Sequence, residues 1–70
     1  MIPPEQLAQA AELFDRYNNA LDPFAPESVA AGHDFKEMTS RLHQSHAPDV
    51  DFHEFRHELV HRCREFLRKN

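Results

Sequence analysis

Hydrophobic residues near the start of the chain recur at spacings of three and four positions, which is the pattern of one face of an α-helix. The members of this face are Leu7, Ala10, Phe14, Tyr17 and Leu21. Pro4 suits the first turn of such a helix, where the missing N–H has no partner to lose. Pro23 and Pro26 disfavour helical geometry in the residue before each of them. We therefore predict a first helix over residues 4–20, followed by a loop.

The second apolar face is shorter and is formed by Phe35, Met38 and Leu42. Asp34 and Glu37 have the spacing of a capping box, which favours a helix over residues 35–46. Before it, a short helical turn over 26–31 would end at Gly32. The alternative is one continuous helix over 26–45 that tolerates Gly32 in its interior at a cost of about 1 kcal/mol.

A third helix is predicted over residues 51–68, because Asp51 and Glu54 form a second capping box before another apolar face. That face consists of Phe52, Phe55, Leu59, Cys63 and Phe66. The single glycine and the lack of alternating β-branched residues argue against a sheet. The pattern thus predicts an all-α protein, a small antiparallel three-helix bundle in which residues 1–70 form one helical domain.

Composition favours a folded chain and indicates the cellular compartment in which we expect it. Of the 70 residues, 40% are hydrophobic and 29% are charged, as in ordinary globular domains. Cys63 is the only cysteine, so no disulfide can form within one copy, which favours a reducing compartment. With no signal-like start and no long apolar run, we expect a cytoplasmic protein that does not enter membranes.

The third predicted helix carries an unusual histidine pattern. His53, His57 and His61 are four positions apart, and Glu54 and Glu58 follow the first two, so H-E-x-x-H occurs twice. This resembles the zinc-protease motif, in which two histidines bind zinc and the glutamate activates a bound water. A third ligand is lacking, however, and the histidines fall on the solvent side of the helix. We therefore expect no enzymatic activity.

Two non-catalytic interpretations of the ladder His53, His57 and His61 stay open. Adjacent rungs could chelate Zn, Ni or Cu, and a second copy could complete the coordination shell. The favoured interpretation is a hydrated helix face in which histidines and glutamates pair along the helix. We accordingly expect no cofactor, with zinc as the alternative.

Charge is distributed unevenly along the chain. Residues 1–34 hold six acidic side chains and one basic one, whereas residues 35–70 hold six acidic and seven basic ones. The net charge is -4, and the basic residues of the third helix alternate with acidic ones, which is unfavourable for nucleic acid. A small nucleic-acid-binding regulator is therefore only a third possibility.

Association with another protein is the function that the sequence favours. A chain this short has a thin core, so burial against a second chain would stabilise it. Four residues widen the apolar faces of the first and third helices and are candidate interface residues, although they could equally line the core of a monomer: Leu13, Ala20, Val60 and Leu67. We predict a small helical protein-interaction or assembly module, whose partner is another protein or a second copy. The alternative is the metal-binding helical protein described above.

Overall fold

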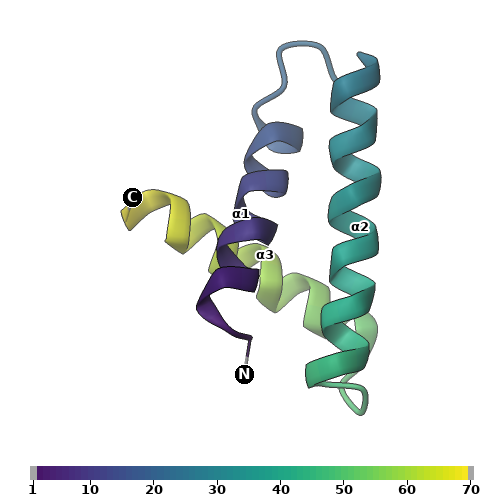
Figure 1. Cartoon of the computed structure of the whole chain (residues 1–70), viewed down its shortest axis with the longest axis vertical. Helices are drawn as coiled ribbons and strands as arrows, with labels where there is room; N and C mark the ends of the chain where they lie inside the picture. The colour runs from purple at the N-terminus through teal and green to yellow at the C-terminus, as the bar shows by residue number, and fades with distance from the viewer. Residues whose placement is uncertain (1, 70) are drawn as a thin grey trace.

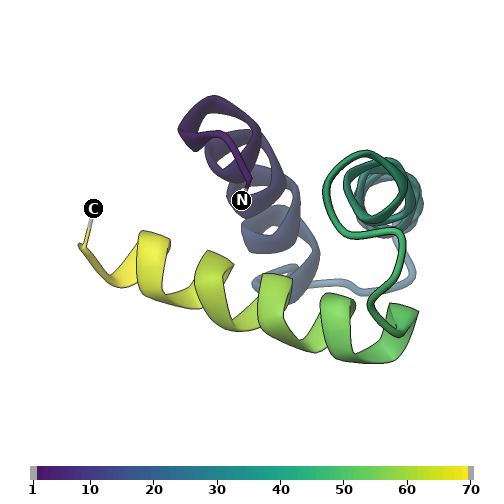
Figure 2. The same cartoon turned by 90° about the horizontal axis from the view of Figure 1, so that it is seen from below.

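The computed structural model describes residues 2–69, which form three α-helices: α1 (Pro4–Asn18), α2 (Pro26–His46) and α3 (Phe52–Lys69). Helices α1 and α2 lie side by side as an antiparallel hairpin, and α3 crosses both of them on one side (Figures 1 and 2). Over residues 2–69 no strand is present. The predicted all-α three-helix fold is confirmed.

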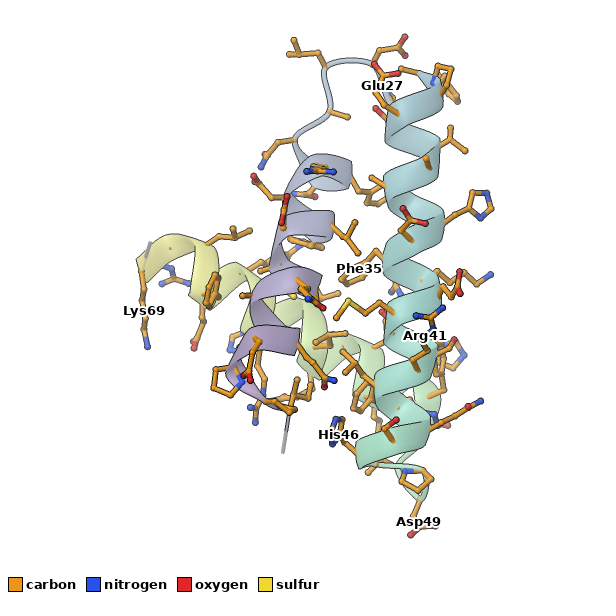
Figure 3. The ribbon with its side chains drawn as sticks, in the orientation of Figure 1. Glu27, Phe35, Arg41, His46, Asp49 and Lys69 are labelled. Carbon is orange, nitrogen blue, oxygen red and sulfur yellow. The ribbon has the colours of Figure 1, made fainter. Side chains whose placement is uncertain are left out.

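The core lies where the apolar faces of the three helices meet. The rings of Phe14 and Phe35 are 5.6 Å apart between their centroids. Phe35 projects from α2 toward α1 (Figure 3). Ala10 and Ala11 on α1 are both completely buried in this core. Helix α3 contributes buried side chains at every turn of its inner face, namely Phe55, Leu59 and Cys63.

Helix α1 ends earlier than the sequence predicts. Its last residue is Asn18, and Leu21 lies beyond it with a fully exposed side chain. Asp22 organises the chain after the helix: one carboxylate oxygen accepts a hydrogen bond from the Phe24 N–H at 3.0 Å, and its carbonyl accepts one from the Ser28 hydroxyl at 2.8 Å. These bonds favour a loop over another helical turn. The prediction that Leu21 belongs to the buried helix face is therefore wrong.

Helix α2 is continuous through Gly32, so the expected break at that residue and the predicted helix start at residue 35 are wrong, and the alternative of one continuous helix is observed. Gly32 does not adopt a positive φ, which a left-handed helix stop requires. Its role is steric instead, because the ring of Tyr17 packs where a Cβ would point.

The connection from α2 to α3 is held by side chains on both sides. Asp51 caps α3 as predicted, since its carboxylate accepts hydrogen bonds from the N–H groups of His53 at 3.0 Å and Glu54 at 3.3 Å. His43 donates from Nε2 to the carbonyl oxygen of Val50 at 2.6 Å. Its ring also packs against the first aromatic ring of α3, Phe52, with centroids 5.4 Å apart. These contacts fix where α3 begins.

Candidate interaction surface

Large apolar side chains are exposed in the loop where the α1–α2 hairpin turns and on the helix ends that flank it. Leu21 is 104% exposed and Phe24 is 88% exposed, while Tyr17 and Val29 on the adjoining helix ends are about half exposed. We call these four residues the hairpin-end surface. Burying a leucine or phenylalanine side chain fully is worth about 1.5–3 kcal/mol. The hairpin-end surface therefore offers free energy that the isolated chain leaves unused.

A groove of about 470 Å³ shares residues with this surface and is lined by both the α1–α2 hairpin and α3. Its apolar lining includes Tyr17 and Val29 from the hairpin and Phe52 from α3. Lys36 on α2 and Arg56 on α3 also line it. We call it the basic groove.

The charge of the basic groove is unbalanced. No carboxylate is among its lining residues. Within residues 2–69, Lys36 and Arg56 take part in no ion pair or hydrogen bond of their side chains. Three of the five other arginines pair with a glutamate one turn away, at 2.6 to 3.2 Å, namely Arg16, Arg41 and Arg62, whereas Arg64 and Arg68 form no such pair within residues 2–69. The groove thus combines apolar walls with two uncompensated positive charges in a chain whose net charge is -4.

A second hollow, of about 580 Å³, lies where α1, the loop and α2 meet and has no lining residue from α3. Its charged lining is mainly acidic: Asp22, Glu27 and Asp34, with Arg16 as the basic member. Glu27 lies in the first turn of α2, next to the loop (Figure 3). The loop end of the hairpin therefore carries acidic groups beside exposed apolar ones.

The four candidate interface residues lie mostly against the protein's own core. Leu13, Val60 and Leu67 are partly buried and pack against the core cluster. Ala20 is partly buried and lines the second hollow. Leu13, Val60 and Leu67 therefore fit a role in the monomer's core, whereas Ala20 is not part of the core cluster. Whether any of the four contacts a partner stays a prediction.

Sequence reasoning missed the most exposed apolar residues. Leu21 continues the helical spacing of α1, which assigned it to the buried face. Phe24 stands between Pro23 and Pro26, where neither helix can include it. A large apolar residue confined to a predicted loop was the signal that could have identified this surface.

The histidine ladder lies in the solvent, as its spacing predicts. His53, His57 and His61 are all exposed, and His61 Nε2 lies 3.3 Å from a carboxylate oxygen of Glu65. Across residues 2–69, no group of three or more His, Cys, Asp or Glu side chains has an arrangement that could hold a metal ion. The hypothesis of a metal shared with a second copy stays a prediction.

Cys63 is fully buried, and desolvation raises the pKa of its thiol to about 11. The thiolate is the nucleophilic form of cysteine. At neutral pH the side chain is therefore a protonated, enclosed thiol that contributes packing.

Among the described residues, no helix combines the length and the apolar character needed to cross a membrane. The chain matches no protein-family model, and no curated protein or solved structure is significantly similar to it.

Proposed function

We propose that this protein is a non-catalytic interaction module that associates with other protein chains through its hairpin-end surface. The observation that supports this proposal is the complete exposure of Leu21 and the near-complete exposure of Phe24 in the same loop. Clustered apolar side chains on an exposed surface are typical of protein–protein contact sites.

Hydrogen bonds within the loop that carries these side chains favour one backbone conformation, which lowers the entropy cost of binding. Asp22 holds the turn through its bonds to the Phe24 N–H and the Ser28 hydroxyl. The Ala25 N–H also donates to the Asp22 carbonyl oxygen, at 3.1 Å. Pro23 and Pro26 restrict the backbone further. The hairpin-end surface is therefore pre-organised for contact.

Site-specific photo-crosslinking tests the proposal. Phe24 is replaced by p-benzoylphenylalanine, which keeps an aromatic side chain, and the chain is produced at native level in its own cells. We expect a crosslinked protein adduct on irradiation. Adding Leu21→Ser should remove most of the adduct, because it deletes the neighbouring apolar contact.

The matched control places the same crosslinker at Val50. This residue is 42% exposed but lies in the loop between α2 and α3, at the other end of the hairpin. An adduct at position 24 that is no stronger than the one at position 50, or that persists with Leu21→Ser, contradicts the proposed function.

A further inference from the structure

We infer that the occupant of the basic groove is a second copy of this chain, whose loop between α1 and α2 inserts Phe24 and whose first turn of α2 presents Glu27 to Lys36 and Arg56. This inference rests on the proposed function and names the partner. The contact is reciprocal: the loop of each copy lies in the groove of the other.

Charge complementarity selects this occupant. From position 19 to position 27 the chain contains two acidic residues, Asp22 and Glu27, and no basic one. Among residues 2–69 Glu27 has no side-chain partner, and the same holds for Lys36 and Arg56. Unpaired charges of opposite sign thus lie beside the loop and in the groove of the same molecule. Complementary charges suppress wrong partners and set the register of an interface.

The apolar parts are complementary as well. The loop presents projecting side chains, Leu21 and Phe24, whereas the groove presents a hollow lined by Tyr17, Val29 and Phe52. Pockets of about 300–1,000 Å³ hold whole small ligands, so about 470 Å³ is ample for a phenylalanine side chain. Contact between the Phe24 ring and the aromatic rings of Tyr17 and Phe52 would add to the free energy gained by burying the Phe24 side chain.

The placement of loop and groove favours a closed pair over a chain of copies. Pro23 belongs to the loop and also lines the groove of its own molecule, so the projecting and receiving parts adjoin. Two copies related by a two-fold axis near this edge can each insert a loop into the other. Such an isologous contact uses the same surface on both copies and closes at two.

Sedimentation equilibrium of the purified chain, from low micromolar to millimolar concentration, is the first measurement. We expect a concentration-dependent shift from the 8.2 kDa monomer to twice that mass. Phe24→Ser should weaken the association about tenfold or more, as expected for an interface hot spot. Val50→Ser, a matched loss of an exposed apolar side chain at the other end of the hairpin, should leave it unchanged.

Charge reversal then tests the pairing itself. Lys36→Glu with Arg56→Glu, or Glu27→Lys alone, should each weaken self-association, because groove and loop then carry like charges. Mixing these two variants should restore association as a heterodimer, because each groove again meets a loop of opposite charge. The expected recovery is to within a few-fold of the wild-type dissociation constant.

Matched controls separate this pairing from net charge. Arg68→Glu with Lys69→Glu reverses two positive charges at the far end of α3 and is the control for the groove variant. Glu5→Lys reverses one negative charge in the first turn of α1 and is the control for Glu27→Lys, which does so in the first turn of α2. Both controls should leave self-association within about twofold of wild type. Circular dichroism of every variant verifies that the three helices are retained.

Three outcomes would overturn the inference: a wild-type chain that stays monomeric throughout, charge reversals that act no more strongly than their controls, or a mixture that does not recover. If the crosslinker at position 24 then captures a different protein in cells, the proposed function stands and only the identity of the partner is wrong. If it captures nothing, both proposals fail.

Discussion

Tyr17 occupies the space that a side chain at position 32 would need. A Cβ on Gly32 would lie 3.0 Å from both Cδ1 and Cε1 of the Tyr17 ring. The one glycine of the chain therefore stands in the interior of α2 to let the end of α1 approach closely, and its helical φ needs no glycine.

Gly32→Ala tests this contact by a double-mutant cycle. Helix propensity favours alanine by about 1 kcal/mol, whereas the contact with Tyr17 opposes it. We expect the full gain in free energy of unfolding only in a Tyr17→Ala background, and at least about 0.5 kcal/mol less of it in the wild type. Urea denaturation of the four proteins measures the difference, and equal gains in both backgrounds would show that the contact costs nothing.

Leu59→Ala removes the largest fully buried apolar side chain of α3, which is 1% exposed. We expect the free energy of unfolding to fall by about 2–5 kcal/mol. A domain of this size has a total free energy of unfolding of roughly 4–10 kcal/mol, so the substitution removes a large part of it. Thermal melting by circular dichroism checks this. Leu21→Ala serves as the control, because its exposed side chain should change stability by no more than about 0.5 kcal/mol.

His43→Ala removes the link between α2 and the start of α3. The lost interactions are its hydrogen bond to the Val50 carbonyl and its ring contacts with Phe52 and Phe55, at 5.4 and 5.3 Å between centroids. We expect a loss of about 1–3 kcal/mol in free energy of unfolding. Replacing exposed His57 in the same way should have little effect, and a similar loss from both would refute the role assigned to His43.

The raised pKa of the Cys63 thiol predicts that the folded protein loses stability at alkaline pH. Burial raises the pKa of its thiol from 9.0 to about 11 in the folded protein. Between these values the unfolded chain releases the thiol proton and the folded chain retains it, so the contribution is intact below pH 9 and declines up to about pH 11. The stability of the wild type relative to Cys63→Ala should fall by up to roughly 2 kcal/mol over this range. A constant difference in urea denaturation between pH 8 and 11 would be inconsistent with this assignment.

The period of apolar residues and the capping residues predicted the structure correctly where the contacts lie within one helix or at its end. The period of apolar residues predicted Phe14, Phe35, Phe55 and Leu59 as core positions, and all four are buried. The Asp51 cap was predicted from its position before the helix and is confirmed by two hydrogen bonds. Such signals depend on neighbours within a few positions, which the sequence displays directly.

The pattern failed where contacts outside a single helix decided the outcome. Gly32 was read as a helix stop because glycine favours that role, yet its neighbour from α1, Tyr17, explains it. Leu21 matched the period of α1, yet the hydrogen bonds around Asp22 form a loop that turns it into solvent. The basic groove could not be predicted either, because Lys36 and Arg56 are 20 positions apart and meet one hollow only when α3 crosses the hairpin.

The sequence by itself determined the three amphipathic helices, most of their buried positions and the solvent exposure of the histidine ladder, because helical period and capping act over short distances along the chain. Only the tertiary structure decided that α2 is continuous, that the hairpin turns with Leu21 and Phe24 exposed, and that two unpaired cations border an apolar groove beside them. The Gly32–Tyr17 contact and the groove depend on how separate helices pack together, and the exposed loop depends on hydrogen bonds around Asp22. Neither leaves a signal in the period of apolar residues.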